Sequence, residues 1–378
     1  MISKPETIDV LLPYGEMLRT FVEQPFISKS DLKAVLRSRG IFVSGSEKED
    51  TIPIAVCCLL SPFEFGQLKE CQNTKEDGQK TITRFLNWNS ADTLMNAVPS
   101  DIDLEALLDE NSNYCKMIGN PTFVPVANNP DHLRVDFEIE RQDLSKSWAT
   151  TNSVFKGSLE LEKIYDGKNV KVLLKHTASE TKQLNLSVSK HLKEHFENTG
   201  RIPSAGGETR ILFKDFTNEQ RVQFFLSLTG YNKTDLLEFK DVIDFDICPD
   251  ADAGKLPNEI KWMEQKVEEL KLKGKNLHET IFIKEAKYHK YLHVHQIDVK
   301  FDFSYYAAAG SCTIVFAFAG FMGESGKSAE LEINVSNLVL KPEHRDVNKA
   351  SVKEHISRAI EMFTLEQYRK ICPQPRGA

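Results

Sequence analysis

The chain has 378 residues, of which 40% are hydrophobic and 27% charged, a composition that is typical of globular proteins and excludes a largely disordered chain. The formal net charge of −7 excludes a general attraction to nucleic acid, so any such binding needs a local basic patch. The seven cysteines form no CxxC pair, and neither long apolar stretch is uninterrupted over the length of a membrane span. We therefore expect a cytoplasmic protein with free thiols and no membrane segment.

Helical patterns dominate the first third of the chain. Leu32, Val35 and Leu36 lie on one face of a helix predicted over residues 28–39, and Gly40 follows at the position of a C-terminal cap. The spacing of these apolar residues predicts a helix whose opposite face is polar.

A second helix is predicted to begin near Thr51, with Pro53 in its first turn, where the missing backbone N–H costs little. Weaker helical patterns follow it. We therefore predict a helical N-terminal domain over residues 1–118, and a linker over the Pro- and Asn-rich residues 119–131.

The pattern changes to a period of two at the start of the remaining segment, residues 132–378. Val135 and Phe137 alternate with charged residues, as expected for a half-buried strand. Alternating residues also flank Asp166 and Gly167, which is the signature of a β-hairpin. This segment is therefore predicted to be an α+β domain of antiparallel β-hairpins with interspersed helices.

Further elements are predicted along this domain. Thr217 and Gln220 have the spacing of a capping box and predict the start of a helix that ends at Gly230. An apolar stripe that includes Ile260 and Met263 predicts a long helix. This helix is predicted over residues 258–273. The remaining predicted elements are strands over 280–284, 297–303, 313–319 and 331–335, and a final helix over 352–363.

Two short segments resemble one another and suggest an internal duplication. Residues 184–189 read Leu-Asn-Leu-Ser-Val-Ser, and residues 331–336 read Leu-Glu-Ile-Asn-Val-Ser. Each precedes a Lys-Glu-His triplet in a predicted helix. A duplicated unit of hairpin and helix would account for this, although six residues also match by chance.

A basic stripe is predicted on the first helix. Lys29, Lys33 and Arg37 recur every four residues and therefore share one helix face, with Arg39 nearby. Clustered Lys and Arg side chains contact phosphate groups in nucleic acids. These four residues are the candidate nucleic-acid-binding residues.

Residues 27–60 resemble a SAP or helix–extended-loop–helix module. The resemblance rests on Leu32-Lys33, on Arg39-Gly40-Ile41 at the helix exit, on Ser44-Gly45 in the loop, and on a second helix after Lys48. In that family the module is a DNA-binding attachment on larger proteins of repair, chromatin or mobile elements, which implies DNA as a partner here.

The chain departs from the family where the second helix begins. Glu47, Glu49 and Asp50 surround Lys48, and their negative charges would oppose phosphate contact. The alternative is an ordinary pair of core helices with a solvated polar face.

Two carboxylates and a lysine suggest a nuclease of the PD-(D/E)xK kind. Asp250 follows one predicted strand, and Glu285 and Lys287 end another. Such a set could hold Mg²⁺ and position an attacking water molecule. The helix predicted between the two strands argues against this arrangement, and the alternative is solvated charge at strand ends.

Histidines concentrate at His289, His293 and His295. On a strand, all three side chains would point to the same face, which suits metal ligation, although a solvated or partner-facing surface is the alternative. Asp244 and Asp246 also share a strand face and could bind a hard cation, with a solvated acidic loop as the alternative.

Binding is therefore the favoured class of function. We predict a nucleic-acid-associated adaptor that docks DNA through its N-terminal helix pair and engages a protein partner, within a larger DNA-transaction complex. The alternatives are a Mg²⁺-dependent nuclease and a scaffold subunit of a multiprotein complex. No cofactor is implied outside the nuclease alternative.

Overall fold

The computed structural model describes most of the chain and confirms the predicted α+β class, with helices at the N-terminus followed by an antiparallel sheet with interspersed helices. None of the helices in the described residues is long and apolar enough to cross a membrane. The described residues are 12–24, 27–45, 47–76, 78–100, 102–109, 115–142, 152–164, 167–230, 236–263, 267–305, 308–323, 325–344 and 346–372.

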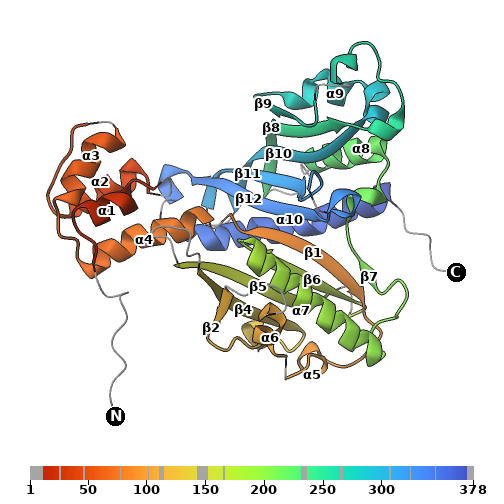
Figure 1. Cartoon of the computed structure of the whole chain (residues 1–378). Helices are drawn as coiled ribbons and strands as arrows, with labels where there is room; N and C mark the ends of the chain where they lie inside the picture. The colour runs from red at the N-terminus through yellow and green to blue at the C-terminus, as the bar shows by residue number, and fades with distance from the viewer. Residues whose placement is uncertain are drawn as a thin grey trace.

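The N-terminal helices form a small bundle with its own hydrophobic core. The bundle consists of α1 (Glu16–Val22), α2 (Lys29–Ser38), α3 (Lys48–Val56) and α4 (Pro62–Glu76). α2 begins as predicted, because the Ser28 hydroxyl accepts the backbone N–H of Asp31 while the Asp31 carboxylate accepts that of Ser28. Helices α1 to α3 stand to one side of the sheet, and α4 runs from them towards it (Figure 1).

The sheet has twelve strands, all of whose pairings are antiparallel, and ten of them follow the order β2-β4-β5-β6-β1-β12-β11-β10-β8-β9. The central strand β1 falls within residues 1–118, where the sequence predicts helices. The strands are β1 (Lys80–Asn87), β2 (Cys115–Ile118), β3 (Val124–Pro125), β4 (His132–Gln142), β5 (Asn152–Ile164), β6 (Asn169–His176), β7 (Glu208–Thr209), β8 (Leu237–Pro249), β9 (Leu270–Lys273), β10 (Leu292–Tyr305), β11 (Ala308–Phe318) and β12 (Leu331–Leu340).

The sheet is built from two topologically similar halves. In the first half, β4, β5 and β6 form a meander that leads into the long helix α7 (Ser179–Asn198). In the second half, β10, β11 and β12 form a meander that leads into the long helix α10 (Lys349–Ile371). The two meanders approach the middle of the sheet from opposite sides, with β1 between β6 and β12.

The repeated topology agrees with a duplicated unit, but the two segments that suggested it do not correspond. Residues 184–189 lie inside helix α7, whereas residues 331–336 lie in strand β12. The similarity between these two six-residue segments is therefore wrong as a marker of the repeat. One segment is helical and the other extended, so the same pattern of apolar residues faces the core with a different period in each.

Four further helices complete the described α-helices. α8 begins at Thr217 with the predicted capping box, in which Thr217 and Gln220 exchange hydrogen bonds between side chains and backbone N–H groups. The four are α5 (Leu94–Ala97), α6 (Leu104–Asp109), α8 (Asn218–Thr229) and α9 (Ile281–Lys284).

Helix α10 lies between the two halves. Its apolar residues, among them Ile356 and Ile360, belong to the core of the second half, together with α8. Its polar side meets the face of the first half that α7 does not cover, where Arg358 lies 3.1 Å from Glu160 of β5. One face of the first half is therefore apolar under α7, and the other is charged under α10.

The helix predicted over residues 258–273 is wrong. The described residues of this range form a 3₁₀ turn, η5 (Lys261–Met263), and the short strand β9. Ile260 and Met263 are buried as predicted, but Leu270 and Leu272 alternate with exposed lysines in β9. The helix was predicted from apolar residues three and four apart, whereas Leu270 and Leu272 are two apart and share one strand face, and pairing with β8 holds this segment as a strand.

The strand predicted over residues 280–284 is also wrong, because Ile281–Lys284 forms the helical turn α9. The backbone N–H of Lys284 bonds the carbonyl of Thr280, which closes this turn. Pairing with a neighbouring strand is what turns a short β-branched run into a strand, and this run has none among the described residues.

Candidate docking surface and placement of the predicted site residues

The four predicted nucleic-acid-binding residues lie in or directly after α2, but they are not equally available. Lys29 and Arg37 are exposed on α2. The ammonium of Lys33 donates to the backbone carbonyl of Gly45, which holds the following loop against the helix. The basic stripe therefore retains Lys29 and Arg37 as exposed cations, with Lys33 committed to the bundle.

Arg39 is also committed to the bundle. Its guanidinium donates to the Glu64 carboxylate of α4 and to the backbone carbonyl of Leu59. The hydrogen bonds from Arg39 lower the pKa of Glu64 to about 2. The pair is bidentate, a geometry that fixes both side chains, so Arg39 ties the end of α2 to the start of α4.

Three large apolar side chains are exposed on residues that lie close in the chain to this ion pair or contact it through the backbone. Phe42 follows Arg39 closely in the chain, Leu59 supplies the carbonyl that Arg39 binds, and Phe63 precedes Glu64. Their exposed fractions are 78% for Phe42, 74% for Leu59 and 73% for Phe63. We call these three residues the apolar patch; the sequence analysis did not single them out, since exposure cannot be read from residue type.

The three residues predicted for a nuclease are not brought together. The ammonium of Lys287 pairs with Glu285 at 2.8 Å, and both side chains are largely exposed. The carboxylate of Asp250 instead accepts the side-chain N–H of Asn218 at 2.7 Å and lies 3.3 Å from His293. Asp250 therefore belongs to a different cluster from Glu285 and Lys287.

The three predicted metal-binding histidines are likewise separated. His289 lies in the 3₁₀ segment η7 (Ala286–Tyr291) and not on a strand, and its Nε2 lies 2.7 Å from the carbonyl of Ile283. His293 and His295 are on β10, where both rings contact Phe321. Burial lowers the pKa of each of these two histidines to about 4, which favours neutral imidazoles.

The environment of His293 is a buried polar cluster. Oδ1 of Asn218 accepts one hydrogen bond from Arg221 and contacts Nδ1 of His293, both at 2.9 Å. Arg221 stacks over the Phe213 ring, and burial lowers its pKa to about 10. These partners hold the ring of His293 in place, which makes it a structural group in the second half.

His295 meets two carboxylates that the sequence analysis did not connect with it. These are Asp246 of β8 and Glu269, which directly precedes β9. The sequence marked Asp246 only as one of two aspartates on a strand face. Glu269 lies in the range 258–273, where the sequence predicted a helix that the structure does not contain. Alternation of Glu269 and Lys271 with Leu270 and Leu272 was the signal that could have revealed the strand.

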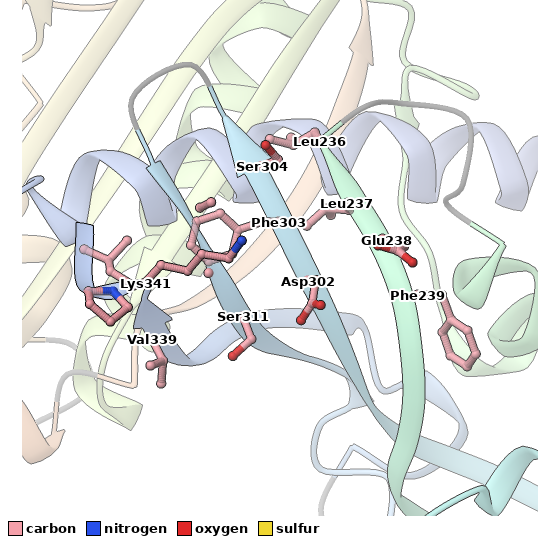
Figure 2. A pocket seen from close by; sticks show the side chains of 14 residues that line it. Leu236, Leu237, Glu238, Phe239, Asp302, Phe303, Ser304, Ser311, Val339 and Lys341 are labelled. Atoms are coloured by element: carbon pink, nitrogen blue, oxygen red, sulfur yellow. The ribbon is translucent and has the colours of Figure 1, made fainter. Parts of the chain in front are cut away.

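A hollow of about 780 Å³ lies at the opposite end of the same strands, between the ends of β8, β10, β11 and β12 (Figure 2). Figure 2 shows Glu238 and Asp302 beside it, and Lys240 pairs with both, at 2.9 and 3.4 Å. These charged groups are exposed and paired. The hollow therefore offers no buried reactive group among its described residues.

The structure thus defines an α+β protein with a helical N-terminal module and a two-part antiparallel sheet. A family model described as the GAPS4b protein N-terminal domain matches residues 16–78, the segment that contains α1 to α4 and ends before β1. The match does not extend into the sheet.

The remaining comparisons identify little. No curated protein is significantly similar to this chain. Among solved structures, the chain is similar to the crystal structure of DynU16, a protein of the dynemicin biosynthetic locus, over 77% of this chain and 98% of that chain. The sequence identity is 9% and the TM-score is 0.17, which is too low to carry an argument about fold or function.

Proposed function

We propose that this chain is a non-catalytic adaptor that docks a protein partner through its N-terminal bundle, as a subunit of a larger nucleic-acid-associated complex. The observation that carries the proposal is the exposure of Phe42, Leu59 and Phe63, the apolar patch, on residues next to the Arg39–Glu64 ion pair in the chain or bonded to it through the backbone.

The apolar patch has the features of a protein-binding surface. Large apolar side chains are costly to leave in water, and neighbouring ones on a surface mark binding sites. Aromatic anchors with a polar surround are typical of the energetic centre of an interface. The ion pair next to these residues in the chain is fixed by two hydrogen bonds, so the surface is ordered before a partner arrives.

The bundle is also suited to act as a module. Its core is separate from the two cores of the sheet, so its folding does not depend on filling a gap in either half. The family match covers the same segment, residues 16–78, which supports treating it as a unit of its own.

The experiment replaces the apolar patch while leaving the ion pair intact. The triple variant Phe42→Ser, Leu59→Ser, Phe63→Ser should weaken the affinity for a protein partner by at least tenfold, since each substitution removes apolar contact area. Candidate partners are the products of the adjoining genes, co-expressed with the full chain and measured by light scattering after size exclusion.

Val339→Ser is the matched control, because Val339 is 60% exposed but belongs to strand β12 and not to the bundle. The control should leave the complex intact. A complex that survives the triple variant, or a chain that stays monomeric with every adjoining product, would overturn the docking proposal.

The nucleic-acid part of the proposal rests on Lys29 and Arg37. Both are exposed on α2, and the double reversal to Glu should abolish salt-sensitive retention on DNA while leaving the fold unchanged. Lys190→Glu on α7 is the control, since that side chain is 76% exposed. Absence of retention of the unaltered chain at low salt would remove nucleic acid as a direct partner.

Metal-dependent hydrolysis of a phosphodiester is the second candidate function. One observation favours it: Asp246 of β8 meets Glu269 and Lys271, which lie directly before and within the neighbouring strand β9. These three residues bring together the two carboxylates and the lysine that such a nuclease needs. The residues that the sequence predicted for this role do not come together. Cleavage of DNA or RNA with Mg²⁺ or Mn²⁺ should be lost in Glu269→Gln. Equal cleavage by both proteins, or none, would remove this candidate.

A further inference from the structure

Three potential metal ligands meet at one edge of the second half. A carboxylate oxygen of Asp246, a carboxylate oxygen of Glu269 and a ring nitrogen of His295 all lie within 4.8 Å of one another. They come from β8, from the residue directly before β9, and from β10, and these strands are consecutive in the sheet. One ion placed between them would therefore be reached by all three.

A β-bulge places His295 in this cluster. In the pairing of β10 with β8, Val294 lies opposite Ile247 and Gln296 lies opposite Asp246, so His295 is an extra residue without a counterpart. Bulges re-aim a side chain and recur next to functional sites. The His295 ring lies on Phe321, with ring centroids 5.5 Å apart, and this contact fixes its plane.

Two buried atoms of the cluster lack hydrogen-bond partners. Asp246 is 3% exposed and His295 is 6% exposed. Neither Oδ1 of Asp246 nor Nε2 of His295 makes a hydrogen bond, although Nε2 lies 3.3 Å from a carboxylate oxygen of Glu269. A buried polar atom without a partner is costly, and a bound ion is one of the few things that satisfies it.

The ammonium group of Lys271 supplies the positive charge that balances the two carboxylates of this cluster. This group lies 3.3 Å from Asp246 and 3.4 Å from Glu269, but the lysine side chain is 55% exposed. A long exposed side chain can swing into water at little cost. The carboxylates are therefore balanced by a charge that a metal ion can replace.

The next pair along the same two strands is different. Asp244 and Lys273 face each other across β8 and β9, with their charged groups 3.1 Å apart, but no histidine joins them in the part of the chain that the structure describes. No atom of Asp244 is buried without a hydrogen-bond partner. This pair has the charges of the cluster without its ligand geometry, and it serves as an internal control.

We propose that Asp246, Glu269 and His295 bind one first-row divalent cation, with Zn²⁺ or Mn²⁺ as the fitting ions, and that the ion displaces the ammonium of Lys271. One imidazole and two carboxylates are ligands that both ions accept. The adjoining cavity of about 260 Å³ has room for water molecules to complete the coordination. The proposal concerns binding alone and does not depend on the adaptor function. The second candidate function would need an ion at these same carboxylates, but ion binding without any cleavage would leave this proposal standing.

Binding is tested on the full chain by equilibrium dialysis and calorimetry with Zn²⁺ alone. The unaltered protein should bind one ion, and Asp246→Asn or His295→Ala should weaken that binding by at least tenfold. Asp244→Asn should leave it unchanged. Lys271→Met should strengthen it, because the competing ammonium is gone.

Mn²⁺ supplies a second readout that does not depend on affinity. Electron paramagnetic resonance of bound Mn²⁺ should show coupling to an imidazole nitrogen, and His295→Ala should abolish that coupling. Equal Zn²⁺ binding by the unaltered protein and by both ligand variants would overturn the proposal. So would the absence of binding, a nitrogen signal that persists without His295, or weaker binding in Lys271→Met.

Discussion

Each half of the sheet contains one histidine beside two carboxylates, but the two clusters are balanced differently. In the first half, Glu160 is contacted by His132 at 2.6 Å, by Arg358 at 3.1 Å and by Lys175 at 3.6 Å. In the second half, the cation that pairs with Asp246 among the described residues is the exposed ammonium of Lys271, at 3.3 Å.

The pKa values express the same difference. Burial tends to raise the pKa of Glu160, but the charge of Lys175 and the hydrogen bond from His132 outweigh it, and the pKa is lowered. For Asp246, burial outweighs the contact with Lys271, and the pKa is raised. Both carboxylates keep one buried oxygen without a hydrogen bond, but Arg358 of helix α10 adds a second cation to the first cluster, whereas the second cluster is left with less positive charge.

The largest expected effect is the loss of Glu160. Glu160→Gln leaves Lys175 and Arg358 beside a neutral amide in a buried site, which should lower the free energy of unfolding by about 3 kcal/mol. Urea denaturation measures it. Glu162→Gln is the control, because Glu162 is 27% exposed and should cost clearly less. A loss below that of the control would contradict a structural role for this network.

An effect of comparable size, but dependent on pH, is expected from Glu361 on the buried side of α10. Burial raises its pKa to about 7, against an ordinary value of 4.5, despite the opposing charges of Lys171 and Lys175. Its folded form thus holds a proton that the unfolded chain has released, so stability is fully present below pH 4.5 and is lost as pH rises towards 7.

The corresponding test compares unfolding free energies from pH 4.5 to 7, the interval between the ordinary and the raised pKa of Glu361. Glu361→Gln should remove a decline of about 1.4 kcal/mol per pH unit and should be more stable than the unaltered chain at neutral pH. Parallel pH profiles of the two proteins would show that Glu361 is ionised in the fold.

The smallest expected effect is the stability change from Asp246→Asn without added metal. The carboxylate is buried and has one oxygen without a hydrogen bond, so an uncharged amide should change the free energy of unfolding by less than about 1 kcal/mol. Thermal and urea unfolding in the presence of a chelator measure this change. A loss as large as that for Glu160→Gln would make the two clusters equivalent.

Local signals in the sequence predicted part of this fold correctly. Ser28 with Asp31 and Thr217 with Gln220 cap helices through contacts within three residues, so the sequence alone determines them. Strand β1 could not be found in this way. It lies between β6 and β12 in the middle of the sheet, and buried residues on both of its faces hide the alternation of a half-buried strand.

The candidate metal cluster shows a different limit. The sequence marked Asp246 and His295, but as members of separate groups. Their meeting depends on the register of β8 with β10, on one bulge, and on the short strand that directly follows Glu269. Each of these is set by pairing between distant segments, which no spacing within either segment reveals.

The most direct test of the difference between the two clusters is the effect of Zn²⁺ on urea unfolding in His295→Ala and His132→Ala. An ion at a hundred times its dissociation constant stabilises the folded chain by about 2.7 kcal/mol. We predict this stabilisation for the unaltered protein and for His132→Ala, and its absence in His295→Ala. Stabilisation lost with His132 and kept without His295 would contradict the account.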